Sequence, residues 1–287
     1  MKLAKFFLVF LLISKVAWAK DVDGRKIVIV ASINPIHQII LAITQDKSNN
    51  VLIFNPASSE HDYNFKKTDA KAVKNADLIF YISADLEKKF PQLIASQNKN
   101  SQAFELIKLT NLKLLQQRNN KEKIDPHIWL DPKNALKIAQ FISQKASTID
   151  PKNAYFYRKN LAKFEKKISA VEKTINAQTL KIRAKNYVIY HDGYQYFEKY
   201  FDLKALQVMN YDHDRELIIH DLKRFDNLAK TGQIKCLFGE AYDEKNSALK
   251  LAQNYKIKFQ TLDLIGQNGD YFDILLKISA TMSDCLK

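Results

Sequence analysis

The sequence predicts an α/β protein of two doubly wound lobes, each with a parallel sheet, joined by one long rigid α-helix. Short β-branched or aromatic runs alternate with helical segments over residues 26–83, and the alternation returns over residues 186–286. Such alternation is typical of βαβ units. Between them, residues 152–191 contain neither proline nor glycine, as a long helix requires. The predicted parts are a signal peptide (1–19), an N-terminal lobe (20–148), a linking helix (149–184) and a C-terminal lobe (185–287).

The N-terminal part alternates predicted strands with predicted helices. Its short apolar runs indicate buried parallel strands. The first helix is predicted with Asn34 as its cap and Pro35 at its first position. The elements are the strand KIVIVAS (26–32), the helix NPIHQIILAIT (34–44), the strand NVLIFNP (50–56), the helix TDAKAVKNA (68–76) and the strand DLIFYIS (77–83).

The C-terminal part repeats this pattern without an internal sequence repeat. Its elements are the strand NYVIYHD (186–192), a helix over 195–200, the strand IKCLFGE (234–240), the helix NSALKLAQNY (246–255), the strand KFQTLDLIG (258–266) and the helix YFDILLKISATMSDCL (271–286). This order again predicts parallel strands with crossover helices.

The linking helix is predicted from one apolar stripe that starts after Pro151. Its members recur at steps of four and three residues, which places them on one helical face. They are Tyr157, Leu161, Phe164, Ile168, Val171 and Ile175. A helix of about 30 residues would span roughly 45 Å. The stripe is short for a two-stranded coiled coil, so a helix joining two lobes is favoured.

The first residues have the features of a secretory signal peptide. Lys2 and Lys5 give a positive start, an apolar core follows, and Ala17-Trp18-Ala19 is a small-residue cleavage site. We expect cleavage after Ala19 and export of a protein without a lipid anchor, because no cysteine follows that site. No other apolar run is long enough to span a membrane.

Charge and cysteine content narrow the function classes. The net charge is +14, but the lysines are spread through the chain and no nucleic-acid motif occurs, so we expect a solvated lysine-rich surface and no nucleic-acid partner. Cys236 and Cys285 are an even pair. In an oxidising compartment they predict one disulfide, with a free buried pair as the alternative.

Three histidines lie where an α/β fold gathers its ligands. His61 follows the strand NVLIFNP in the segment SEHDY, His127 lies in DPHIWLDP before a helix, and His191 ends NYVIYHD. Two carboxylates have similar positions, Asp263 after the strand in TLDLIG and Glu60 beside His61. The C-terminal ends of parallel strands share one edge, and two facing lobes would bring two such edges together.

Three imidazoles and a carboxylate form a tetrahedral site of nitrogen and oxygen ligands. Zn²⁺ suits this set best. An all-oxygen site would have favoured Mg²⁺ or Ca²⁺, and Mn²⁺ would be better served by a carboxylate in place of an imidazole. The sequence therefore predicts a zinc site between the lobes.

At these residues the chain resembles the zinc-binding solute-binding proteins of bacterial high-affinity zinc ABC importers, the ZnuA-like branch of the metal-binding family. The similar segments are ASINPIHQII, NPASSEHDYNFKKTDAKAVKNADLIFYIS, DPHIWLDP, YHDGYQYFEKYF, CLFGE and LDLIG, in the family's order across nearly the whole mature chain. The resemblance implies a metal site in the interlobe cleft and Zn(II) as bound cargo. It further implies a monomeric periplasmic protein that delivers zinc to an inner-membrane ABC permease with its cytoplasmic ATPase, with no chemistry performed on the cargo.

The resemblance also assigns roles residue by residue. His61, His127 and His191 match the family's three histidine ligands, and manganese-binding relatives have glutamate at the position of His191. The fourth ligand is expected to be Asp263, with Glu60 or a water as alternatives. Cys236 and Cys285 match the disulfide pair of zinc-type members. Four further residues lie next to the histidines in sequence. The aromatic ones are expected to shield the site, namely Tyr63, Trp129 and Tyr194. The carboxylate of Asp192 could orient an imidazole.

The chain departs from the resemblance in two places. The segment NLKLLQQRNNKEKID (111–125) has no histidine, whereas many zinc-type members carry a His-rich loop there. The segment NYDHDRELIIHDLKRF (210–225) contains neither proline nor glycine, whereas the relatives tend to have a turn with both residues at this place. Its Asp212, His213 and Asp214 could bind a second metal weakly, but a solvated loop is favoured. His37 and His220 are expected to be packing or surface residues.

Other functions compatible with these residues are a manganese-binding homologue, a metal-dependent adhesin of the same fold, and an exported zinc hydrolase. Three histidines and an open position would suit a catalytic zinc, with Glu60 as a general base. However, the sequence contains neither HExxH nor GxSxG. A binding protein is therefore favoured over an enzyme.

Overall fold

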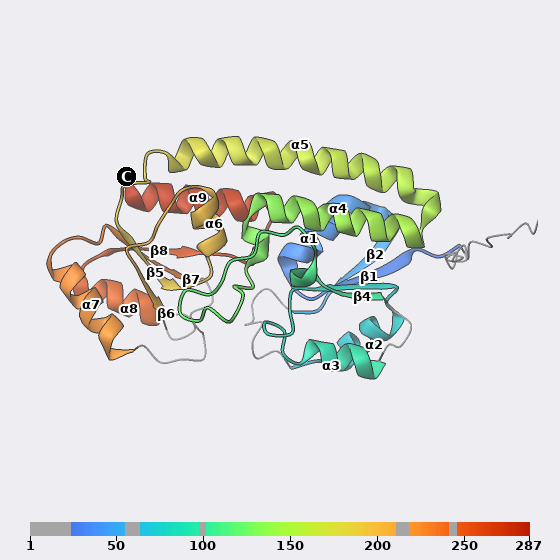
Figure 1. Ribbon diagram of the computed structural model, residues 1–287, viewed down its shortest axis with the longest axis horizontal. Coiled ribbons are helices and arrows are strands. Elements are labelled where there is room, and N and C mark those ends of the chain that lie inside the picture. Colours follow the sequence, from blue (N-terminus) through green and yellow to red (C-terminus); the bar gives the residue numbers. More distant parts are fainter. Residues whose placement is uncertain (1–23, 55–63, 98–101, 211–217, 241–245) are drawn as a thin grey trace, which may run out of the picture.

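The computed structural model describes residues 24–54, 64–97, 102–210, 218–240 and 246–287 (Figure 1). The predicted signal peptide, His61, Glu60 and Tyr63 lie outside these residues, as do Asp212, His213 and Asp214. The architecture is the predicted one, with two four-stranded parallel sheets, helices around each, and one long helix along the side of the molecule.

The N-terminal sheet has the strand order β2-β1-β3-β4, with all neighbours parallel. Its strands are β1 (Ile27–Ala31), β2 (Ser48–Leu52), β3 (Leu78–Tyr81) and β4 (Gln102–Glu105). The helices of this part are α1 (Asn34–Thr44), α2 (Lys67–Asn75) and α3 (Phe90–Gln97), with 3₁₀ turns η1 (Gln45–Lys47) and η2 (Leu106–Lys108). The chain order reverses between β1 and β3, which is where α/β sheets bind ligands.

The C-terminal sheet repeats this topology in the order β6-β5-β7-β8. Its strands are β5 (Tyr187–His191), β6 (Gln207–Asn210), β7 (Cys236–Glu240) and β8 (Lys258–Leu262). Its helices are α6 (Gln195–Tyr200), α7 (Ile219–Lys230), α8 (Ser247–Tyr255) and α9 (Tyr271–Leu286). The order reverses between β5 and β7, so the strands that end in His191 and Glu240 flank the switch point.

Two helices connect the sheets. A 3₁₀ turn, η3 (Ile128–Leu130), leads into α4 (Pro132–Ile149), and the turn η4 (Pro151–Asn153) leads into α5 (Ala154–Thr179). The predicted long helix is confirmed, but it is 26 residues long, or about 39 Å, because Pro151 opens the 3₁₀ turn instead of the helix. It packs against α1, α4 and α9, and so spans both lobes (Figure 1).

The buried face of α5 follows the predicted stripe with two differences. Leu161 is half-buried, and the polar Asn160 is buried on the same face. The Asn160 amide donates a hydrogen bond of 3.0 Å to the carbonyl oxygen of Ile43 at the end of α1. A buried polar side chain needs such a partner, and here the bond fixes the position of α5 along α1.

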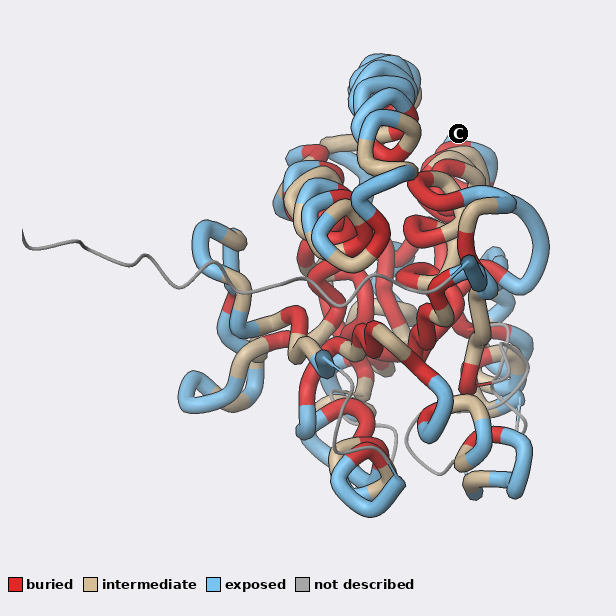
Figure 2. Tube along the Cα trace, turned by 90° about the vertical axis from the view of Figure 1, so that its right-hand side faces the viewer, coloured by how far each residue is buried: buried red, intermediate tan, exposed pale blue. Residues whose placement is uncertain are grey.

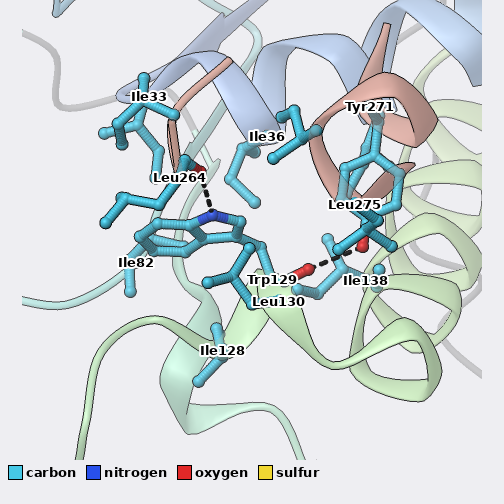
Figure 3. Packing of buried hydrophobic residues seen from close by; sticks show 14 of the residues in the cluster. Ile33, Ile36, Ile82, Ile128, Trp129, Leu130, Ile138, Leu264, Tyr271 and Leu275 are labelled. Carbon is cyan, nitrogen blue, oxygen red and sulfur yellow. Dashed lines mark hydrogen bonds between the residues drawn. The ribbon is translucent and has the colours of Figure 1, made fainter. Parts of the chain in front are cut away.

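One hydrophobic core joins the two lobes (Figure 3). Trp129 of η3 is fully buried, and its Nε1 donates a 2.8 Å hydrogen bond to the carbonyl oxygen of Leu264, in the loop after β8. Tyr271 at the start of α9 donates a 2.6 Å bond from its hydroxyl to the carbonyl oxygen of Trp129. The turn that follows His127 is thereby held against the C-terminal lobe.

Local departures from the prediction have identifiable causes. Ile33, not Asn34, is the N-cap of α1. The Asn34 amide instead donates to the carbonyl oxygens of Ile265, at 3.2 Å, and Gly266, which ties α1 to the C-terminal lobe. β2 begins and ends earlier than predicted because its pairing with β1, from Ser48 to Leu52, sets its length. Residues 90–97, 102–105 and 207–210 form elements that were not predicted.

The predicted disulfide is confirmed. Cys236, at the start of β7, is bonded to Cys285 near the end of α9, with Cα atoms 6.0 Å apart. The bond closes a loop with a sequence separation of 49, and by loss of unfolded-chain entropy it stabilises the fold by at most about 4 kcal/mol. Within the described residues, no helix is long and apolar enough to cross a membrane.

Candidate metal site

His127 is oriented by a carboxylate two residues earlier. The Oδ1 atom of Asp125 accepts a 3.0 Å hydrogen bond from the His127 backbone N–H and lies 2.7 Å from His127 Nδ1. Its other oxygen, Oδ2, accepts a 2.9 Å bond from the side chain of Gln195 on α6. A carboxylate at Nδ1 favours the tautomer with its proton there and the lone pair on Nε2. This is the form in which an imidazole binds a metal.

His191 comes to His127 from the other lobe. It is the last residue of β5, and the centroids of the two imidazole rings are 5.6 Å apart. Glu240, the last residue of the neighbouring β7, has Oε1 at 4.0 Å from His191 Nε2. All three side chains are buried. Two of the histidines predicted as ligands therefore meet between the lobes, His191 from a strand end and His127 from the loop before η3.

Asp263 has a structural role in the turn after β8. Its Oδ1 accepts backbone hydrogen bonds from Ile265 and Gly266, at 3.1 and 2.7 Å, and its Oδ2 accepts one from Gln267 at 2.8 Å. A carboxylate oxygen has a further lone pair, so these bonds leave metal coordination chemically open. Among the described residues, no three metal-ligating side chains form a complete group.

The turn that carries Asp263 packs directly against the His191 segment. A Cβ atom added to Gly193 would lie 2.6 Å from Leu264 Cδ2 and 3.2 Å from His191 Cδ2. Only glycine therefore fits at position 193 without displacing one of these side chains. The close approach brings the turn after β8 to the edge of the histidine pair.

Arg118 connects the loop before His127 to the C-terminal lobe. Its Nη1 lies 3.0 Å from Asp192 Oδ1, and its Nη2 donates to Glu198 on α6. Glu198 also accepts a 2.7 Å hydrogen bond from the Tyr187 hydroxyl. Burial raises the pKa of the Asp192 carboxyl to about 7, although the Arg118 guanidinium opposes this shift. The arginine thus neutralises two buried carboxylates, one of them adjacent to His191.

The other residues singled out from sequence occupy varied positions. Trp129 and Tyr194 are buried, as expected of shielding residues. Asp192, proposed as an orienting carboxylate, forms its ion pair with Arg118, and it is Asp125 that contacts an imidazole. His220 is exposed on α7 and His37 is half-buried on α1.

Three functional residues were missed from sequence. Asp125 directly precedes Pro126 and His127, so the spacing DPH was its signal. Glu240 ends a strand, and the rule used for Asp263 would have found it. Arg118 gave no signal, since it lies 80 residues before Glu198 and only the fold brings the two together.

Comparison with known proteins identifies the family. Residues 29–285 match the family model described as zinc-uptake complex component A, periplasmic (ZnuA). The chain belongs to this family. ZnuA-family proteins are binding components of uptake complexes, so the zinc hydrolase alternative is excluded.

Relatives of this ZnuA-family chain differ in the metal that they are named for. It is 24% identical over 310 residues to the high-affinity zinc uptake system protein ZnuA of Brucella abortus (strain 2308), covering 92% of each chain. It is 27% identical over 290 residues to the manganese ABC transporter substrate-binding lipoprotein PsaA of Streptococcus pneumoniae (serotype 4), covering 96% of this chain and 94% of that one. A crystal structure of a zinc-bound ZnuA deletion mutant superposes with a TM-score of 0.81 at 19% sequence identity. The match covers 92% of this chain and 99% of that chain.

Two conservative variants test whether Asp263 or Glu240 binds the metal. We expect Asp263→Asn to weaken zinc binding by about tenfold or more, because the amide loses the charge that favours the cation. The amide oxygen can still accept from Ile265 and Gly266, although the bond from Gln267 to Oδ2 is lost. Glu240→Gln should weaken it less if Glu240 only neighbours His191. Competition with a chromophoric chelator measures both affinities. A larger loss in Glu240→Gln would assign the ligand to Glu240 instead.

Proposed function

We propose that the protein, after removal of residues 1–19, acts as a monomer that binds Zn²⁺ in the bacterial periplasm. It then delivers the ion to an ABC permease of the inner membrane, which works with a cytoplasmic ATPase. The ligands are His61, His127 and His191 with Asp263 as the fourth, Glu60 or a water being the alternatives. Family membership supports a metal-uptake role, and the donor set determines which ion is favoured.

The observation that carries the proposal is the pair of buried imidazoles from opposite lobes. His127 and His191 have ring centroids 5.6 Å apart, and Asp125 sets the tautomer that presents Nε2 of His127. Two imidazoles favour Zn²⁺ over the harder Mn²⁺. The pairing across the lobes also allows a bound ion to link them.

Manganese is the second candidate cargo, because one of the relatives is named a manganese-binding protein. That cargo would be better served by an additional carboxylate, and Glu240 is 4.0 Å from His191 Nε2. The two candidates therefore differ in whether oxygen or nitrogen ligands dominate the completed site.

A competitive titration tests the proposal. The processed protein, stripped of metal, is titrated with Zn²⁺ and with Mn²⁺ against a chromophoric chelator. We expect one equivalent of tightly bound zinc and much weaker manganese binding. Affinity should fall as the pH is lowered, because protons compete for the imidazole nitrogens. Tighter binding of manganese would establish the second candidate, and no binding of either ion would refute the metal-carrier function.

A further inference from the structure

More than half of the net positive charge of the protein lies on one segment. Residues 151–185, which contain α5, hold ten basic and two acidic side chains, a net charge of +8 against +14 for the whole chain. Three of the remaining positive charges, at Lys2, Lys5 and Lys15, belong to the predicted signal peptide. The charge is therefore less evenly spread than the composition implied, and most of it lies on or beside α5.

The most outward stripe of α5 is basic along its length. Lys159, Lys166 and Lys173 are exposed and recur every seven residues, which is about two helical turns or ~10.5 Å. At about 100° per residue they point within roughly 40° of one another and opposite the buried face. Between them lie small exposed side chains such as Ala162 and Ser169.

The ends of the same stripe carry exposed apolar side chains. Tyr155 is 72% exposed and Leu180 is 63% exposed. Their separation of 25 positions corresponds to nearly seven full turns, so both point within about 20° of the same direction. The two acidic residues of the segment lie to one side, and Glu172 accepts a 2.6 Å hydrogen bond from the Tyr200 hydroxyl.

No carboxylate of the described residues lies within ion-pair distance of the three stripe lysines. Figure 2 shows α5 at the top of the view with its outer side exposed. α4 and α9 lie between α5 and the two sheets, and His191 ends a strand of the C-terminal sheet (Figure 1). The basic stripe is thus a straight, uncompensated ridge on the side of the molecule away from the metal site.

We propose that this ridge, Tyr155 to Leu180 with Lys159, Lys166 and Lys173, binds the surface of an anionic phospholipid membrane. The hollow along these lysines, lined by Lys159, Ala162 and Lys166 among others, is shallow and open to solvent. Lysines in a row on such an open surface suit a diffuse, planar negative potential rather than a single enclosed ligand. A tyrosine and a leucine at the two ends suit the interface between headgroups and acyl chains. Binding through this side leaves the histidines facing away from the lipid and accessible to metal.

Charge complementarity predicts the strength of the interaction. A lysine near an anionic membrane contributes about 1 kcal/mol to the free energy of membrane binding, which corresponds to a roughly fivefold change in affinity. Three lysines and their neighbours therefore give weak, reversible and salt-sensitive binding. Such binding would concentrate a metal carrier near the membrane. It does not depend on which metal is bound, or on whether any is.

Vesicle co-sedimentation of the processed protein tests this proposal. Vesicles of phosphatidylcholine alone are compared with vesicles containing phosphatidylglycerol, at low and at physiological salt. We expect binding only to the anionic vesicles, weakening with salt. The triple variant Lys159→Glu/Lys166→Glu/Lys173→Glu should bind at least about tenfold more weakly.

A matched control separates the ridge from net charge. The variant Lys71→Glu/Lys235→Glu/Lys250→Glu changes the charge equally at exposed positions outside α5, and should bind nearly as the parent does. Equal losses in both variants, or no binding of the parent to anionic vesicles, would overturn the proposal. Zinc titration and circular dichroism of each variant verify the fold. Zinc binding can fail while vesicle binding succeeds, so this test is independent of the proposed function.

Discussion

The His191→Ala variant is expected to bind zinc weaker than the parent by roughly a hundredfold or more. Loss of a residue that only orients a ligand typically costs about 10–100-fold, and a ligand itself should cost at least as much. His191 is buried, and its ring lies beside that of His127, at 5.6 Å between centroids. Chelator competition on metal-stripped protein measures the effect.

Two further variants sharpen this result. His220→Ala removes an exposed histidine on α7, and should leave zinc affinity unchanged. His191→Glu replaces nitrogen with oxygen and should shift the preference toward Mn²⁺. Zinc affinity retained in His191→Ala, with the variant folded by circular dichroism, would show that the metal binds elsewhere.

The fold was predictable because its local signals agree with one another. Apolar runs such as KIVIVAS, each followed by a helical segment, predicted most strands, and the uninterrupted stripe of α5 predicted the long helix. The short elements β4 and β6 were missed. β4 (QAFE) is an edge strand whose first two residues are exposed and in which Phe104 packs on the core. Its sequence therefore lacks the apolar alternation of a strand, and its pairing with β3 forms it.

The candidate site was predictable only in part. The strand-end rule found His191, and the motif DPHIWLDP found His127, because both depend on local sequence. Asp125, which orients His127, is also local in sequence, but the ion pairs of Arg118 with Asp192 and Glu198 depend on contacts between distant segments. Arg118 reaches Asp192 and Glu198 from a loop in which the absence of histidine was the only feature noted. Contacts between distant segments leave no periodicity or spacing in the sequence.

The second large effect is expected in Arg118→Ala. Asp192 and Glu198 are buried. Without the shared cation the Glu198 charge is left uncompensated, and Asp192, whose pKa burial already raises to about 7, must take up a proton. Breaking a buried ion pair from one side costs about 3–5 kcal/mol, and the one-quarter exposure of Arg118 favours the lower end. Denaturant unfolding of the metal-free protein measures this loss. Arg25→Ala, which breaks the exposed pair with Asp77, should cost about 1 kcal/mol or less.

Replacing Arg118, Asp192 and Glu198 together by neutral residues distinguishes two roles of Arg118. One is to compensate the buried carboxylate charges, and the other is to attach the loop before His127 to the C-terminal lobe. In Arg118→Met/Asp192→Asn/Glu198→Gln no charge is left buried, so most of the lost stability should return. The loop before His127 would still have lost its ion pairs to the C-terminal lobe. We therefore expect zinc affinity to stay reduced by about tenfold or more, as for loss of an outer partner of a ligand. Recovery of full affinity would show that Arg118 acts through charge alone.

The rate of zinc release shows whether Arg118 affects how long the protein retains the metal. Asn34 and Trp129 also bond across the lobes, to the carbonyl oxygens of Ile265 and Leu264, so a wide hinge opening would break several buried hydrogen bonds. Metal exchange should instead require local movement of the segments that carry the proposed ligands. Without Arg118, the His127 loop is less firmly held, and zinc should leave faster in chelator-chase measurements. An unchanged release rate with a lowered affinity would mean that Arg118 affects capture of the metal and not its retention.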